Sequence, residues 1–101
     1  MRQAEARATA FRTSLTGTIS ALRELVAERR DAADRYRATS TGAAELERIA
    51  QVSYDAGERG ILELLDAYRG GASARTRQAM LDAAVRQAEI ELEFVTGWEM
   101  Q

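Results

Sequence analysis

The stretch YDAGERGILELLDA occupies residues 54–67, near the middle of a 101-residue chain, and decides the fold. Gly57 and Gly60 interrupt a sequence that otherwise favours helix. Gly57 can take the left-handed conformation that ends a helix. Gly60 can be the N-cap of the next helix, with Glu63 in the first turn near the positive helix end. We therefore predict a tip at 57–60 that joins the two helices of a hairpin.

The apolar residues on either side of this tip recur at spacings of three and four, which indicates amphipathic helices over about 4–56 and 61–96. The first helix is expected to bury Phe11, Leu15, Ile19, Leu22, Leu25 and Val26, then Ala32, Ala33 and Tyr36, then Leu46, Ile49, Val52 and Ala56. The second is expected to bury Leu62, Leu65, Tyr68 and Ala72, then Met80, Leu81, Ala84, Val85, Ala88, Leu92 and Val95. Gly97 is expected to be the C-cap, with 97–101 as a short tail.

Glycines inside the arms weaken the helical pattern, because each costs roughly 1 kcal/mol against alanine in a helix. Gly42 ends the run Thr-Ser-Thr-Gly at 39–42, where Ser40 or Thr41 could cap a new helix. We prefer one long helix that can bend near Gly42. The pair Gly70-Gly71 interrupts the second arm in the same way.

Composition supports an all-α fold. The chain has no proline, is rich in alanine, leucine, glutamate and arginine, and has only 6% aromatic residues. Narrow seams between helices suit such a chain better than a thick core. We expect a single long antiparallel helical hairpin, coiled-coil-like, over residues 1–101. Alanines on further faces favour packing within a larger helical assembly.

Charge and missing residue types narrow the function. The net charge is -2, from 14 basic residues, all arginine, and 16 acidic ones, which does not indicate a nucleic-acid partner. Histidine and cysteine are absent, so the commonest general base, the thiol nucleophile and most transition-metal ligand sets are missing. We expect no enzymatic activity, no cofactor and no metal site. The sequence also shows neither a signal peptide nor a spanning apolar segment.

The central stretch resembles the TolC-type outer-membrane efflux proteins, in particular their heavy-metal-efflux branch. The likeness lies in a tyrosine at Tyr54, a glycine at Gly57, an arginine at Arg59 and the apolar run that ends in Leu-Leu-Asp-Ala at 64–67. About a dozen consecutive positions agree. Tyr68-Arg69, Arg75, Glu89 and the closing Val95-Thr96-Gly97 fit the same family. The first arm matches only in its helical character.

The resemblance implies a homotrimeric duct with a β-barrel in the outer membrane and an α-helical barrel in the periplasm. This chain would supply the lower part of a descending helix, the periplasmic tip and the returning helix. The family's adaptor-facing tip falls on Ala56, Gly57, Glu58 and Arg59, and its partners are a periplasmic adaptor and an inner-membrane pump. The family's entrance constriction falls on Tyr54, Arg59, Glu63 and Asp66.

Simple electrostatics is compatible with that implication. Glu63 and Asp66 are three residues apart and share a helix face, where Arg59 can offset their like charges. Three copies of both acids around an axis would favour cations at a constriction. The resemblance also implies that this chain is a fragment, because it lacks the family's signal peptide and strands and covers only the C-terminal helical part of the family's second repeat. A free-standing helical hairpin that acts as a scaffold remains the alternative, since composition supports it equally well.

Overall fold

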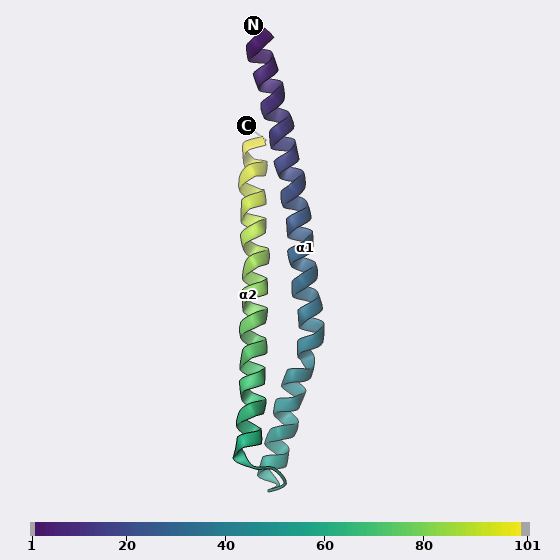
Figure 1. The fold of residues 1–101 in the computed structure, drawn as a ribbon, viewed down its shortest axis with the longest axis vertical. Helices are drawn as coiled ribbons and strands as arrows, with labels where there is room; N and C mark the ends of the chain where they lie inside the picture. Colours follow the sequence, from purple (N-terminus) through teal and green to yellow (C-terminus); the bar gives the residue numbers. More distant parts are fainter. Residues whose placement is uncertain (1, 100–101) are drawn as a thin grey trace.

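The structure, a computed structural model, describes residues 2–99 and consists of two helices joined by a turn (Figure 1). Helix α1 spans Arg2–Asp55 and helix α2 spans Ile61–Glu99. They run antiparallel, and both chain ends lie at the end opposite the turn, where α1 extends beyond α2. The rod measures 83 × 17 × 15 Å. The predicted all-α antiparallel hairpin is confirmed.

Both helices run without interruption through the glycines inside the two arms. Gly42 lies inside α1, and Gly70 and Gly71 lie inside α2, so neither site breaks a helix. The predicted C-cap at Gly97 is wrong, because α2 continues to Glu99 and Gly97 has no positive φ angle. Intrahelical hydrogen bonding therefore outweighs the low helix propensity of these glycines, of which only Gly71 is buried. Residues 100–101 of the predicted tail lie outside the described residues.

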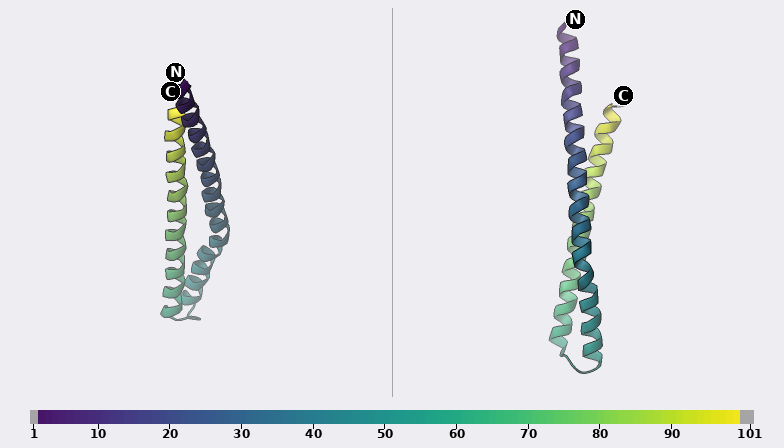
Figure 2. Two further views of the ribbon diagram at one scale, coloured as in Figure 1. Left: turned by 45° about the horizontal axis from the view of Figure 1, so that its top comes forward. Right: turned by 90° about the vertical axis from the view of Figure 1, so that its right-hand side faces the viewer.

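Helix α1 bends in the teal part of the ribbon, around residue 40 (Figures 1 and 2). The hydroxyl groups of Thr39, Ser40 and Thr41 donate hydrogen bonds to the carbonyl oxygens three residues earlier, at 2.9, 3.3 and 2.9 Å. Side-chain hydroxyls that bond back to the preceding turn bend helices. Three consecutive bonds of this kind, followed by Gly42, account for the bend without a break.

The two helices wrap around one another along a single line of contact, which we call the seam (Figure 2). Its residues are spaced alternately three and four apart, the heptad spacing that brings one helix face continuously against a partner, except that the exposed Arg29 occupies one such position between Val26 and Ala33. On α1 the seam comprises Leu15, Ile19, Leu22, Val26, Ala33, Tyr36, Ser40, Ala43, Glu47 and Ala50, all buried or half-buried. On α2 it comprises Leu64, Ala67, Gly71, Ala74, Gln78, Leu81, Val85, Ala88, Leu92 and Val95, also buried or half-buried.

The seam has two chemically different halves. The far half, at 15–36 of α1 and 81–95 of α2, has large apolar side chains at all its seam positions except Ala33 and Ala88. The tip half, at 40–50 of α1 and 64–78 of α2, has alanine, glycine, serine, glutamate and glutamine, and Leu64 is its one large apolar seam residue. Apolar burial is therefore concentrated in the far half.

The structure corrects part of the predicted core. The stripe Leu46, Ile49, Val52 does not form the seam, because these side chains are 62, 39 and 57% exposed. Leu62, Leu65 and Tyr68 are likewise exposed, as are Phe11 and Met80. The predicted residues of the far half, from Leu15 to Val26 and from Leu81 to Val95, do contain the buried positions Ile19, Val26 and Ala88.

Candidate functional site

The tip turn is built by the local sequence. Gly57 has a φ angle of 76°, and its amide donates to the carbonyl of Tyr54 at 3.0 Å. The amide of Glu58 donates to the carbonyl of Ser53 at 2.8 Å. These two bonds form the Schellman motif, which satisfies the last carbonyls of a helix when the C′ residue is left-handed. The predicted role of Gly57 is confirmed.

The second helix also starts as predicted. The carbonyl of Gly60 accepts the amide of Leu64 at 3.3 Å, which makes Gly60 the N-cap of α2. Glu63 is the acidic residue of the first turn. The helix dipole favours a negative charge at this position. Together the two glycines fix the direction in which α2 returns along α1.

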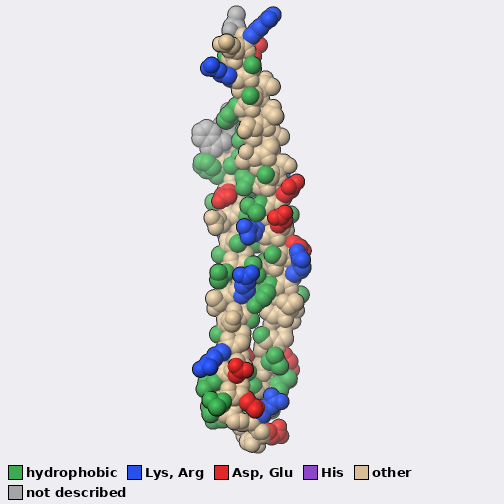
Figure 3. All heavy atoms as spheres, viewed as in Figure 1, with side chains coloured by type: hydrophobic (Ala, Val, Ile, Leu, Met, Phe, Trp, Pro, Cys, Tyr) green, Lys and Arg blue, Asp and Glu red, His purple; other side chains and the backbone are tan. Residues whose placement is uncertain are grey.

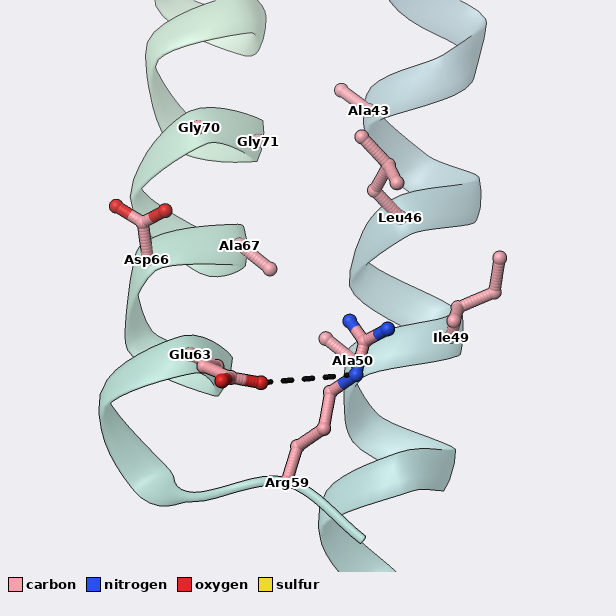
Figure 4. Close-up of a pocket in the computed structure, with 10 residues that line it drawn as sticks. All are labelled: Ala43, Leu46, Ile49, Ala50, Arg59, Glu63, Asp66, Ala67, Gly70 and Gly71. Atoms are coloured by element: carbon pink, nitrogen blue, oxygen red, sulfur yellow. Dashed lines mark ion pairs between the residues drawn. The ribbon is translucent and has the colours of Figure 1, made fainter.

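A shallow groove of about 460 Å³ lies directly above the turn, between the two helices (Figure 4). Three of the predicted constriction residues, Arg59, Glu63 and Asp66, line it together with Ala43, Leu46, Ile49, Ala50, Ala67, Gly70 and Gly71. Arg59 Nε lies 3.7 Å from Glu63 Oε2, and both side chains are more than half exposed. An ion pair this exposed contributes at most about 1 kcal/mol.

Arg59 offsets only one of the two acids. Figure 4 shows the Arg59 side chain extending upward between the helices, with Glu63 pointing toward it and Asp66 pointing away from α1. Within the described part of the chain, Asp66 forms no ion pair. Figure 3 shows hydrophobic side chains and both signs of charge gathered at the tip end of the rod. The groove is therefore an amphipathic surface, suited to contact with another helix.

The remaining predicted site residues lie at the tip but outside this groove. Tyr54 is 39% exposed, does not line the groove, and contributes its backbone carbonyl to the turn. Ala56, Gly57 and Glu58 are exposed in the turn together with Arg59. The tip residues are thus accessible as one continuous surface at the end of the rod.

Sequence reasoning missed the polar contacts that cross between the helices near the tip. Arg75 Nη1 lies 2.9 Å from Glu47 Oε1, and the Glu47 side chain is only 15% exposed. A Cβ atom on Gly71 would lie 1.3 Å from Glu47 Oε1. Gly71 therefore provides the space in which Glu47 occupies the seam. The sequence signal was present: Glu47 continues the heptad spacing set by Ile19, Val26 and Ala33.

A second polar contact crosses beside the first. The Tyr68 hydroxyl donates to Gln51 Oε1 at 2.8 Å, and Gln51 Nε2 donates to Asp55 Oδ1 at 3.0 Å. Tyrosine and arginine contacts between helices do exist here, but Tyr68 and Arg75 make them within the hairpin, where the resemblance pointed to Tyr54 and Arg59. Whether Tyr54 and Arg59 contact another chain stays a prediction.

Further ion pairs lie on the surface of the rod away from the tip. Arg30–Glu89 at 3.1 Å and Arg37–Asp82 at 2.8 Å join the two helices farther from the tip. On α1, the hydrogen bond and the charge of Arg48 lower the pKa of the exposed Glu45 carboxyl.

Over the described residues there is no group of three or more acids suited to hold a metal ion. Neither described helix has a stretch apolar enough to span a bilayer.

Comparison with known proteins adds no relative to this picture. No protein-family profile, no curated protein and no solved structure matches the chain.

Proposed function

We propose that this hairpin is a wall segment of an oligomeric α-helical duct of the outer-membrane efflux type. The observation that carries the proposal is a second apolar stripe on α2, opposite the seam. Leu62, Leu65, Met80 and Ile90 are 78, 43, 59 and 50% exposed on this outer face. The small residues Ala72, Ala79 and Ala83 are exposed between them. An isolated two-helix coil has polar residues at these positions.

The outer face of α1 differs from that of α2. Along its middle it carries charged residues, among them Glu24, Glu28, Asp31, Asp34 and Arg35, all of them exposed. Arg35 pairs with Asp31 and Arg37 with Asp34 within the helix. Water solvates such a face well. The asymmetry favours an arrangement in which α2 packs against a further helix of a neighbouring hairpin while the middle of α1 faces solvent.

The tip fits the same proposal. Its residues 56–59 are exposed at the end of an 83 Å rod, where a periplasmic adaptor could reach them. Glu63 and Asp66 follow within two turns of α2. In a homotrimer the six carboxylates of these residues would surround one axis and favour cations at the entrance. The central YDAGERGILELLDA stretch supports the family assignment, and the outer face of α2 supports the need for neighbours.

Sedimentation of the isolated chain tests this proposal against the free-standing scaffold. We expect the chain to associate into trimers or larger species as its concentration rises. Met80→Glu with Ile90→Glu should abolish association, because two charges then lie on the proposed contact face. Ala21→Glu with Ala38→Glu adds the same charge to exposed positions of α1 and is the matched control.

The outcomes separate the two functions. A well-folded monomer at every concentration would favour a hairpin that works alone as a scaffold. Association that survives the α2 substitutions, or that the α1 control also abolishes, would contradict the assignment of the outer face of α2 as the contact surface.

A further inference from the structure

The bend in α1 lies where the seam changes character. Ser40, in the middle of the three back-bonded hydroxyls at 39–41, is also the first seam residue of the tip half. A hydroxyl hydrogen bond to the preceding turn gives the backbone a local alternative to regular helical bonding. The helix can therefore change its angle at residues 39–42 while losing few main-chain bonds.

Gln78 of α2 is the seam residue at this boundary. Its Nε2 group donates to the backbone carbonyl of Ala33 at 3.2 Å and to Asp82 Oδ1 at 3.0 Å. Its Oε1 atom is buried and accepts no hydrogen bond. A buried acceptor without a donor is unfavourable, and contact with water would relieve this penalty. At Gln78 the closed seam therefore gains one hydrogen bond to α1 and leaves one buried acceptor unpaired.

Between this boundary and the turn, the apolar part of the seam is small, with Ala50 and Leu64 as its buried residues, and polar side chains make the hydrogen bonds across it. Glu47 pairs with Arg75, whose side chain is 64% exposed, and Tyr68 bonds to Gln51. Water can replace each of these partners when the helices separate, because hydrogen bonds exchanged with solvent have small net free energies. Separating the far half instead exposes Ile19, Val26 and Leu92, which water does not compensate.

We propose that the tip half of the seam opens as a unit, with α1 bowing away from α2 between a hinge at residues 39–42 and the tip turn, while the far half stays closed. This motion is intrinsic to one hairpin and does not depend on the proposed duct. Opening hydrates Gln78 Oε1 and exposes Glu47 and Gln51, polar groups that a partner helix could then contact. The Schellman turn at 53–58 keeps the two helices joined.

Two spin-label pairs on the full chain test the proposal, which is practical because the chain has no native cysteine. Ala44→Cys with Ser73→Cys places labels across the tip half, and Ala27→Cys with Ile90→Cys places them across the far half. All four residues are exposed. Labelled chain is diluted with unlabelled chain so that only distances within a hairpin are measured by double electron–electron resonance. We expect a broad or two-component distance distribution for the tip pair and a narrow one for the far pair.

Amide hydrogen exchange supplies the second measurement. We expect exchange in residues 43–52 and 64–78 to be faster than in residues 19–33 and 81–92, since a short helical segment that has separated from its partner helix unravels more readily and then exposes its amides. Gln78→Leu should slow exchange in the tip half by about fivefold or more, because it removes a buried unpaired acceptor worth at least about a factor of five. Gln87→Leu, the same change at an exposed position of α2, is the matched control.

Three results would overturn the proposal. They are equally narrow distance distributions in the two halves, equal exchange rates in the two halves, or equal effects of Gln78→Leu and Gln87→Leu on tip-half exchange. Circular dichroism confirms that each variant keeps its helices, so that a loss of fold is not mistaken for opening.

Discussion

The far half and the tip half of the hairpin share one spacing and differ in what occupies it. Both follow the alternation of three and four residues, from Leu15 to Ala50 on α1 and from Leu64 to Val95 on α2. In the far half most positions hold leucine, isoleucine or valine, and full burial of such a side chain contributes roughly 1.5–3 kcal/mol. In the tip half all positions except Leu64 hold small or polar residues. Heptad spacing therefore sets which faces meet, and side-chain size sets how firmly they adhere.

On the outer surface, large apolar residues are prominent in the tip half, the reverse of their distribution in the seam. Near the tip most large apolar residues, such as Leu46 and Leu62, lie outside the seam and remain exposed, and Leu64 is the buried exception. The tip half thus holds its own helices weakly and presents its apolar surface outward. That division suits a region that exchanges contacts with partners, whereas the far half acts as the stable stem.

The largest expected difference between the two halves is the loss of unfolding free energy when one large aliphatic residue of α1 is truncated in each half. Ile19→Ala, at a seam position only 4% exposed, should lower the free energy of unfolding by about 2–4 kcal/mol. Leu46→Ala, at a position 62% exposed, should change it by less than about 0.5 kcal/mol in the monomer. Urea unfolding at low concentration measures both. Equal losses would mean that the stem does not lie in the far half.

Substitution by alanine should change the stability of the chain differently at the two neighbouring glycines of the tip half. At Gly70 nothing lies within 4 Å of an added Cβ, so Gly70→Ala should stabilise the chain by up to about 1 kcal/mol through helix propensity. At Gly71 the added Cβ meets Glu47, so Gly71→Ala should displace that carboxylate and forfeit the gain. Thermal unfolding of Gly71→Ala with Glu47→Ala should recover the gain. Equal stabilisation at both glycines would contradict the placement of the Glu47 side chain against Gly71.

The smallest expected effect belongs to an ion pair on the outer surface of α1. Arg48 hydrogen-bonds Glu45 and lowers the pKa of its carboxyl. A lowered folded-state pKa adds stability above the unfolded value of 4.5, and this stability is lost as pH falls through the folded value. Arg48→Gln should remove this small pH-dependent contribution and leave the free energy of unfolding at neutral pH nearly unchanged. Chemical denaturation between acidic and neutral pH checks it, and a larger loss at neutral pH would contradict the purely local role.

Features set by neighbouring residues were predictable from the sequence. The left-handed Gly57, the N-cap at Gly60 and the acid Glu63 in the first turn follow from backbone sterics and from the unpaired groups at helix ends. The nearness of Arg59 to Glu63 follows from their spacing as well, whereas Asp66 points away from α1. These inferences need no knowledge of which faces of the two helices meet.

Features that depend on the register between the helices were not predictable in the same way. Leu46, Ile49 and Val52 are spaced as a helical stripe, and so are Ala43, Glu47 and Ala50 one position away. The sequence favours the first stripe, because its side chains are more apolar. The structure buries the second, because it continues the heptads of Leu15–Val26, where the large residues fix the alignment. Glu47 beside Gly71 follows from that alignment.

By itself, the sequence determined a proline-free helical hairpin with its turn at 57–60, within one residue of the turn that the structure places between Asp55 and Ile61, because turn and capping chemistry act over a few residues. Only the tertiary structure decided which stripe became the seam, which acid was covered, and which apolar residues remained outside. Those outcomes depend on pairing residues about 20 to 75 positions apart, where several faces with the same period compete and the one that packs the far half closely sets the register for the rest.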